Sequence, residues 1–171
     1  MSNTVEKAKE KEQEKIREDI DRRIKEYFDK IFAPRMRIVL DEGAKMPTRA
    51  HSTDGGLDIY ARDTQVVSAR ESAKFDTGVH VEIPKGYVGF LKSKSGLNVK
   101  HGITSEGVID CGYTGSIVVK LYNNSGYDYV VEAGSKISQL VLLPILLPNI
   151  ELVDSLDSTE RGNNGFGSTG G

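Results

Sequence analysis

One carboxylate in this 171-residue chain stands where it could serve as a general base. Asp110 lies in the segment GVIDCGYTG, residues 107–115, directly after two apolar residues and before a Cys-Gly pair that favours a turn. Tyr113 follows three residues later. These positions place the carboxylate near the tip of a hairpin, with a tyrosine beside it, where it could take a proton from water.

Two further polar segments lie between apolar runs. STDGGLDIYA, residues 52–61, puts Asp54 and Asp58 beside two glycines at the start of a strand, and taken alone it favours a turn capped by Asx side chains. KSKSGLNVK, residues 92–100, has the composition of a basic loop whose lysines face either phosphate groups or solvent. The residues alone leave both alternatives open.

The segment RGNNGFGSTGG, residues 161–171, has too little apolar surface to fold alone, yet it carries groups that bind nucleotides. Arg161 can fork onto phosphate, hydroxyls and glycine N–H groups can donate to phosphate oxygens, and Phe166 can stack on a base. The string GFGSTG fits the G-x-G-x-x-G pattern, but that fingerprint needs a following helix, and only one residue follows it. We predict a flexible lid over a nucleotide. The alternative is a disordered terminus.

Few other side chains offer catalytic chemistry. The histidines are isolated and lack the spacing of metal ligands, so surface or loop positions are expected for His51, His80 and His101. Cys111 has no obvious histidine partner in the sequence and is interpreted as a buried or loop cysteine. Neither a P-loop nor an H-E-x-x-H motif is present. The chain is therefore expected to act without a P-loop and without a zinc ion bound by protein.

Composition and charge exclude several classes of protein. A net charge of -2 gives no general reason to expect binding to nucleic acid or to a membrane surface. The single cysteine excludes an internal disulfide framework and suits a reducing compartment. The first residues hold no apolar signal core, and the longest apolar stretch, LVLLPILLPNI, is too short and too interrupted by proline to span a bilayer. We expect a cytoplasmic protein.

The first element of the chain is a predicted helix over residues 5–32. It is rich in Glu, Lys and Arg, and Pro34 ends the pattern. An apolar stripe recurs every four positions, at Ile16, Ile20, Ile24, Phe28 and Phe32. We expect this stripe to lie on a β domain, either its own or that of a neighbouring subunit. The alternatives are a solvated helix that awaits a partner protein and a three-stranded coil through Ile20, Ile24, Tyr27 and Ile31.

After the helix, short alternating or apolar runs are separated by Gly, Pro, Asn and Asp, a pattern typical of all-β sandwiches and barrels. In AKFDTGVHVEIP the alternation of apolar and polar residues is interrupted at Gly78, which predicts a strand with a β-bulge. No segment of helix length interrupts the set. We expect a jelly-roll-like β domain over residues 35–156, a helical extension over 1–34 and a flexible arm over 157–171. The runs are MRIVLD, LDIYA, AKFDTGVHVEIP, GYVGFLKS, GVIDCGYTGSIVVKLYN, DYVVEAGSKISQLVLLPIL and NIELVDSL.

Five segments, taken in order, resemble the motifs of the trimeric deoxyuridine triphosphatases (dUTPases): STDGGLDIYA, KSKSGLN, GVIDCGYTG, KISQLVLLP and RGNNGFGSTGG. The resemblance covers about residues 36–171 and leaves only the helix outside it. It implies hydrolysis of dUTP to dUMP and pyrophosphate, a reaction that limits uracil incorporation into DNA and supplies dUMP for thymidylate synthesis.

The resemblance also implies roles for individual residues at the phosphates. Asp110 would orient and deprotonate the water that attacks the α-phosphorus. Mg²⁺ would be held by triphosphate oxygens and water, with Asp58 acting through metal-bound water or through contacts with groups around the metal, and not as a direct ligand. Gln139 would hydrogen-bond a phosphate or the attacking water. The family usually has arginine at the first position of the phosphate-contacting loop, which here is Lys94, Ser95 and Gly96.

Selectivity and closure would come from two other segments. A hairpin would read the uracil edge, exclude the thymine methyl group and pack a tyrosine on deoxyribose, through Gly107, Val108, Ile109 and Tyr113. In the C-terminal arm Arg161 would reach the phosphates and Phe166 would stack on uracil, while the γ-phosphate would be wrapped by Gly167, Ser168 and Thr169. In the family this arm crosses to a site built by other subunits, so a homotrimer with three shared sites is implied.

Two other functions stay open on the sequence alone. A nucleotide-responsive regulatory binding protein could use the same fold, with the helix docking a partner, although the intact Asp110, Tyr113 and arm favour an enzyme. A dCTP deaminase-type enzyme would not need the arm in this form. Pyrophosphate release from dUTP and deamination of dCTP distinguish the three.

Overall fold

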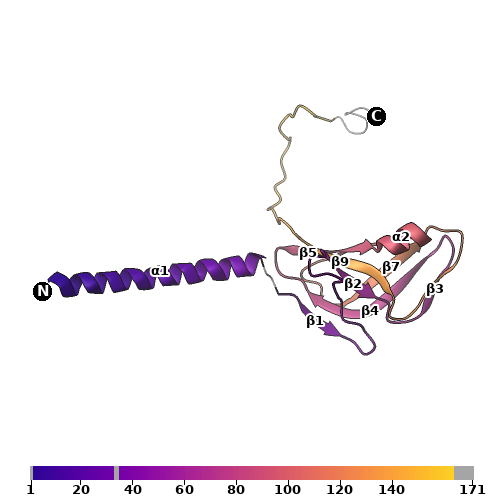
Figure 1. Ribbon diagram of the computed structural model, residues 1–171. Helices are drawn as coiled ribbons and strands as arrows, with labels where there is room; N and C mark the ends of the chain where they lie inside the picture. Colours follow the sequence, from indigo (N-terminus) through magenta and orange to yellow (C-terminus); the bar gives the residue numbers. More distant parts are fainter. Residues whose placement is uncertain (1, 33–34, 164–171) are drawn as a thin grey trace.

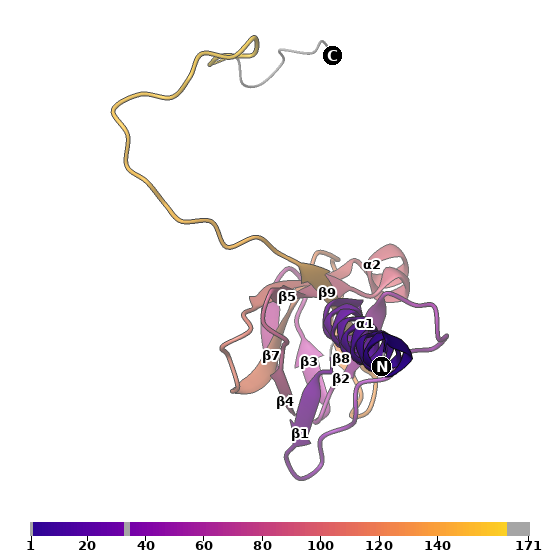
Figure 2. The same cartoon turned by 90° about the vertical axis from the view of Figure 1, so that its left-hand side faces the viewer.

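The computed structural model describes residues 2–32 and 35–163 of the chain. A long helix, α1 (Ser2–Phe32), projects from a curled β domain, and an extended C-terminal segment runs away from the same domain (Figures 1 and 2). The predicted N-terminal helix is thereby confirmed. None of the described helices is long and apolar enough to span a bilayer.

The β domain is built from two antiparallel sheets. One has seven strands in the order β1-β4-β7-β6-β5-β9-β2, and the other pairs β3 with β8. Strands distant in sequence, such as β1 and β4, lie side by side, and the curled sheet has the expected jelly-roll-like fold. The strands are β1 (Arg37–Leu40), β2 (Gly56–Tyr60), β3 (Gln65–Val67), β4 (Ser72–Glu82), β5 (Tyr87–Ser93), β6 (Ile103–Ile109), β7 (Ser116–Asn123), β8 (Tyr129–Val131) and β9 (Lys136–Pro144).

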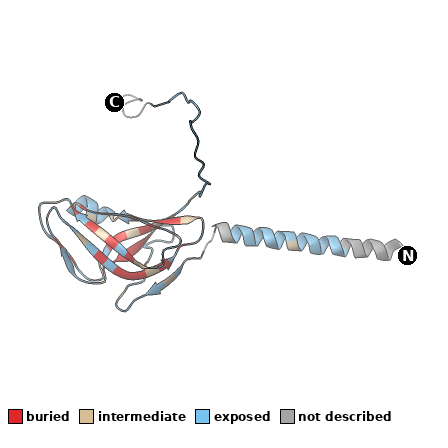
Figure 3. Cartoon of the chain, turned by 180° about the vertical axis from the view of Figure 1, so that it is seen from behind, coloured by how far each residue is buried: buried red, intermediate tan, exposed pale blue. Residues whose placement is uncertain are grey.

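The alternating burial of side chains along the strands shows where the core lies. In β7, Ile117, Val119 and Leu121 are buried, whereas Val118 between them is exposed. Successive side chains of a strand point to opposite faces, so one face of β7 lines the interior. Figure 3 shows that burial concentrates inside the β domain, while the described parts of α1 and the C-terminal segment are exposed. The functional residues must therefore be positioned by the β domain.

The bulge predicted at Gly78 is confirmed. The register of β4 against β7 shifts between Asp76 and His80, and Gly78 has a φ of 63°. A Cβ at this position would lie 3.0 Å from the Ala44 Cβ and 3.1 Å from the Asp41 Cβ. The left-handed backbone and the close approach of neighbouring side chains both favour glycine here.

The structure differs from the predicted pattern at three places. The basic loop after β5 is a short helix, α2 (Ser95–His101), because local hydrogen bonds satisfy its backbone and Gly102 ends it in the left-handed conformation. Residues 65–67, absent from the predicted runs, form β3 against β8. Residues 149–156, predicted as a strand, form none, because no strand of the described structure pairs with them.

The apolar stripe of α1 is open to solvent. Between residues 11 and 29 every side chain is exposed except that of Asp19, which is partly buried. Ile20 is 50% exposed and Ile24 is 49% exposed. The helix projects away from the domain (Figure 1), so the prediction that it packs on its own β domain is wrong. Packing on a neighbouring subunit stays a prediction.

Candidate active site

Asp58 is held between two lysines inside the β domain. One carboxylate oxygen accepts a hydrogen bond from Lys94 Nζ at 2.6 Å, and the other lies 2.6 Å from Lys136 Nζ. Asp58 is only 5% exposed. A buried carboxylate without partners would be costly, and the two ammonium groups compensate for its loss of water.

The lysines also fix the charge of Asp58. Burial by itself raises the pKa of this carboxyl, but the hydrogen bonds from Lys136 and Lys94 outweigh it, so the pKa lies below the ordinary value of 3.8. Contact with Asp58 in turn raises the pKa of Lys136. The side chain is therefore ionised at neutral pH and positions two cations.

Asp58 and Lys94 line a cleft of about 270 Å³ together with Gln139, which pairs with Asp58 across β2 and β9. Gly56 shapes this cleft, because a Cβ there would lie 2.8 Å from Gln139 Oε1 and would push the amide aside. The remaining wall includes Asp54, whose carboxylate accepts from the backbone N–H of His51 at 2.9 Å. Cation, carboxylate and amide therefore meet in one polar cleft.

Ser95 and Gly96 follow Lys94 at the start of α2, and both are exposed. A Cβ at Gly96 would meet nothing within 4 Å, so packing within this chain does not require a glycine there. Open space beside Lys94 is what the close approach of a ligand to the backbone would need. The structure thus brings together five of the predicted site residues: Asp58, Lys94, Ser95, Gly96 and Gln139.

The turn between β6 and β7 carries Asp110 and Tyr113. The backbone N–H of Tyr113 donates to the Asp110 carbonyl at 3.0 Å, and Tyr113 Oη donates to the Ser116 carbonyl at 2.8 Å. Gly115 permits this arrangement, because a Cβ there would lie 2.5 Å from Tyr113 Oη. Asp110 is exposed, so its carboxylate is accessible to water.

Strand β6 leads into this turn and contributes the rest of the predicted hairpin. Ile109 is buried in the core, whereas Val108 is 58% exposed. Gly107 lies against Leu91 of β5, and a Cβ on Gly107 would come within 3.1 Å of Leu91 Cδ1. The hairpin is therefore anchored on one face and open on the other.

The cleft and the turn lie at opposite ends of the β5–β6 pair. Ile109 pairs with Gly89 near the start of β5, whereas Lys94 follows the end of that strand. The stretch from Gly89 to Lys94 spans about 16 Å at roughly 3.3 Å per residue. Within one chain Asp110 is therefore separated from the cleft around Asp58, and each end holds one part of the predicted site, which we call a partial site.

Of the predicted C-terminal arm residues, Arg161 lies in the described part of the chain. Arg161 is exposed on the extended segment that leaves the domain (Figure 1). The other predicted arm residues lie outside the described residues, and these are Phe166, Gly167, Ser168 and Thr169.

Lys136 is a candidate that the sequence analysis missed. It begins β9, three residues before Gln139, and it pairs with Tyr60 of β2. The available signal was its place as the first residue of the KISQ motif, but only the antiparallel pairing of β2 with β9 shows that it reaches Asp58. Among the described residues, no group of three or more His, Cys, Asp or Glu side chains is arranged to hold a metal ion.

The amino-acid sequence of this chain is similar to those of known proteins. The dUTPase family model matches residues 42–170. The deoxyuridine 5'-triphosphate nucleotidohydrolase of Clostridium acetobutylicum is 41% identical over 134 residues, which cover 77% of this chain and 92% of that protein. The probable deoxyuridine 5'-triphosphate nucleotidohydrolase of Schizosaccharomyces pombe is 42% identical over 132 residues, which cover 77% of this chain and 94% of that protein.

Solved structures match as well. The dUTPase of Staphylococcus bacteriophage 80alpha with dUpNHpp gives a TM-score of 0.76 at 34% identity, covering 81% of this chain and 99% of that one. A mutant dUTPase from phage phi11 of S. aureus, whose structure concerns the coordination of a structural Mg(II) ion, gives a TM-score of 0.67 at 33% identity, covering 71% and 97%. Since the family match spans both partial sites and relatives above 40% identity are covered almost end to end, this chain belongs to the dUTPase family.

Proposed function

We propose that this chain is a dUTP diphosphatase, which hydrolyses dUTP to dUMP and pyrophosphate by water attack at the α-phosphorus. One observation carries the proposal: the chain holds a polar cleft around Asp58 and Lys94 and, on a separate turn, the exposed carboxylate of Asp110 beside Tyr113. Cations for a triphosphate and a base for the attacking water are what this reaction requires. Membership of the dUTPase family supports dUTP as the substrate.

Asp110 is assigned as the general base. Its turn is ordered by the two hydrogen bonds of Tyr113, so the carboxylate projects from a fixed backbone. A water held against Asp110 gives its proton to the carboxylate as its oxygen attacks the α-phosphorus, and pyrophosphate leaves. In this proposal Tyr113 packs on deoxyribose, and the uracil edge is read along Gly107, Val108 and Ile109.

The cleft is assigned to the phosphates. Lys94 has a 22% exposed side chain and can exchange one Asp58 oxygen for a phosphate oxygen, while Lys136 keeps Asp58 neutralised. Ser95, Gly96 and Gln139 would donate further hydrogen bonds. Mg²⁺ fits this site as a partner of the triphosphate, because both Asp58 oxygens already accept from lysines, and it would there neutralise phosphate charge. Asp58 would contact it through water.

A homotrimer with shared sites is part of the proposal. The cleft and the turn lie at opposite ends of one chain, so a second copy must supply the missing end. The C-terminal segment supports exchange between copies, because in the single chain it exposes a series of apolar side chains: Leu146, Leu147, Ile150, Leu152 and Leu156. Arg161 and the arm would then close over a neighbour's site. The free thiol of Cys111 suits the cytoplasmic location that this function implies.

The test is release of pyrophosphate from dUTP, dTTP, dCTP and UTP in parallel, with and without Mg²⁺. We expect rapid release from dUTP alone, and slower release when Mg²⁺ is removed by chelation. Equal rates on all four nucleotides would refute the assigned selectivity. Deamination of dCTP without pyrophosphate release would assign the chain to the deaminase alternative, and nucleotide binding without any turnover would favour the regulatory one.

A further inference from the structure

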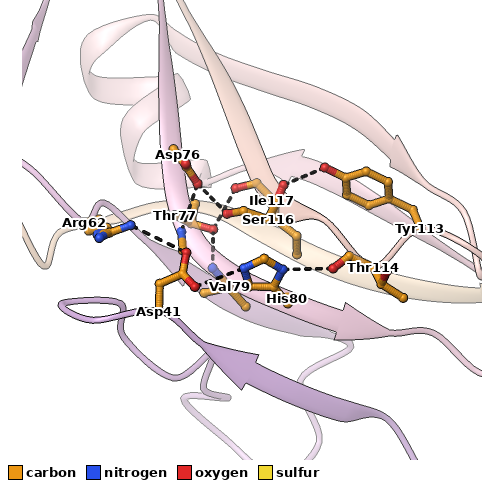
Figure 4. Close-up of polar contacts among 11 residues, drawn as sticks. Asp41, Arg62, Asp76, Thr77, Val79, His80, Tyr113, Thr114, Ser116 and Ile117 are labelled. Carbon is orange, nitrogen blue, oxygen red and sulfur yellow. Dashed lines mark hydrogen bonds and ion pairs between the residues drawn. The ribbon is translucent and has the colours of Figure 1, made fainter.

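His80 contacts two different parts of the β domain at once (Figure 4). It lies on β4, where its Nδ1 is 2.9 Å from the carbonyl oxygen of Thr114 and its Nε2 is 3.3 Å from Asp41 Oδ1. Thr114 belongs to the turn between β6 and β7, and Asp41 follows β1. We call His80, Asp41 and Thr114 the His80 brace.

The two contacts together require a protonated ring. A neutral imidazole has one N–H group and one lone pair, so it can donate to Thr114 or to Asp41, but not to both. If Nδ1 alone carried a proton, the lone pair of Nε2 would face the carboxylate. Only the imidazolium form donates to both acceptors.

The surroundings of the ring favour this charged form. The hydrogen bond to Thr114 and then that to Asp41 raise the pKa of His80 above its ordinary value of 6.5, against the opposing effect of desolvation. Asp41 is shared with Arg62, whose Nη1 lies 3.7 Å from Asp41 Oδ2. An open hollow of about 820 Å³ gives solvent access to the ring. The charged groups around it are Asp41, Asp76, Arg62, Arg37 and Glu82.

The brace acts on the backbone next to Tyr113. Thr114 directly follows Tyr113, whose hydroxyl donates to the carbonyl of Ser116. Ser116 is also the residue that pairs with His80 across β4 and β7, and its hydroxyl donates to Asp76 of β4. Figure 4 shows His80 between Asp41 and Thr114, and the contact between Tyr113 and Ser116 nearby. Release of the Thr114 carbonyl would therefore loosen the segment that carries the tyrosine.

We propose that His80 is a positioning residue for the turn from Asp110 to Gly115. Its imidazolium ties the Thr114 carbonyl to Asp41 and so holds Tyr113 and the carboxylate of Asp110 in the geometry that productive binding of the nucleotide needs. This inference rests on the proposed function of the same turn.

The pH dependence follows from the two protonation states. A group whose pKa is raised on folding contributes stability that is complete below its unfolded pKa and is lost as the pH rises through its folded pKa. The brace is therefore complete below about pH 6.5 and weakens as the pH rises through the higher folded value. Loss of one hydrogen bond of this kind corresponds to about a two- to tenfold weaker interaction, which we expect to appear as a rise in KM for dUTP over that interval.

The test compares His80→Gln and Asp41→Asn with His101→Gln, a matched control on α2. For each protein, the KM and kcat for dUTP are measured across pH, and the His80 ring is titrated by NMR. We expect the wild type and the control to share a KM inflection that coincides with the His80 titration. His80→Gln should lack this inflection, and Asp41→Asn should move it to lower pH together with the ring pKa. A KM profile in His80→Gln identical to that of the wild type would overturn the proposal.

A second measurement separates this inference from the proposed function. Amide hydrogen exchange of Tyr113 in the nucleotide-free protein, expressed as a protection factor, reports the turn without any turnover. We expect protection to fall as the pH rises through the His80 titration in the wild type and in His101→Gln, and to be low at every pH in His80→Gln. Unchanged protection would refute the brace, whereas absence of dUTP hydrolysis in the wild type would refute the proposed function alone.

Discussion

A buried carboxylate flanked by two lysines, as at Asp58, acts by holding cations in place. Because its pKa is lowered, its ion pairs contribute stability that is present above the ordinary carboxyl pKa of 3.8 and is lost as the pH falls through the folded value. The charge of Asp58 is therefore constant near neutral pH. A pH dependence in that range has to come from other groups, and His80 is placed to supply one.

Asp110→Asn tests the assigned base. The substitution keeps the size of the side chain but removes its ability to accept a proton, and loss of a general base typically slows a reaction by ~10²–10⁴-fold. We expect dUTP still to bind, as measured by calorimetry, while pyrophosphate release falls by that factor. Glu106→Gln, the same chemical change at an exposed position of β6, is the control and should keep normal turnover. Near-normal turnover in Asp110→Asn would exclude the assignment.

Lys94→Met tests the phosphate contact. Hydrogen bonds to charged groups contribute about 1.5–3 kcal/mol, so we expect KM for dUTP to rise by roughly 10–100-fold. Lys92→Met is the control, because Lys92 pairs with exposed Glu106 at 3.5 Å and does not line the cleft. Lys94→Arg should retain activity, since guanidinium keeps the charge and also binds phosphate. Equal KM values for the two methionine variants would remove Lys94 from the site.

At the scale of elements, the sequence pattern predicted the features that depend on neighbouring residues alone. The interrupted alternation of apolar and polar residues at Gly78 predicted the bulge. A bulge breaks this alternation, and its positive φ favours glycine. Helix α2 was missed because its seven residues bury no side chain and therefore show no apolar period. The three-residue strand β3 has too few positions to display an alternation of apolar and polar residues.

The same limit explains the site residues. Asp58 and Gln139 could be named from their motifs, yet their contact depends on β2 pairing with β9, which are far apart in the sequence. Lys136 joins Asp58 only through this pairing, so no short motif contains both partners. The motifs supplied the predicted site residues, and the strand order determines which of them meet within one chain.

Deletion of residues 1–33 tests the independence of α1. The described side chains of the helix are almost all exposed, so its removal takes away no core of the β domain. We expect the melting temperature to fall only modestly, through loss of the predicted packing on a neighbouring subunit, and the rate of dUTP hydrolysis to stay nearly unchanged, as measured by calorimetry and pyrophosphate release. A lower molecular mass of the assembly after deletion would instead show that α1 holds subunits together.

At the scale of the molecule, the proposed homotrimer would bring together the two partial sites that one chain keeps apart. The strands that build a stable core also separate the cleft from the turn, since both lie at the ends of the same β5–β6 pair. Symmetric association of copies can place the turn of one beside the cleft of another, and each copy then serves two sites. The exposed apolar side chains after β9, such as Ile150 and Leu152, need a cover of the same kind.

Truncation after Glu160 tests the C-terminal arm. The removed residues follow a described segment that is exposed from residue 146 onward, so we expect the shortened chain to stay folded and assembled while its dUTP hydrolysis falls to a low level. Circular dichroism and light scattering check the first expectation, and pyrophosphate release checks the second. Unfolding or dissociation of the shortened chain would show that these residues serve the core or the assembly.

Mixing shortened chains with full-length Asp110→Asn chains tests whether the arm acts across subunits. Each chain alone is expected to be inactive, one without the arm and the other without the base. If arm and base come from different subunits, random mixing in equal amounts completes roughly a quarter of the sites, and hydrolysis should recover in proportion. The control mixes the Asp110→Asn chain with a chain that carries both changes, which completes no site. Mixed trimers verified by mass spectrometry that show no recovery would mean that each arm closes over the base of its own subunit.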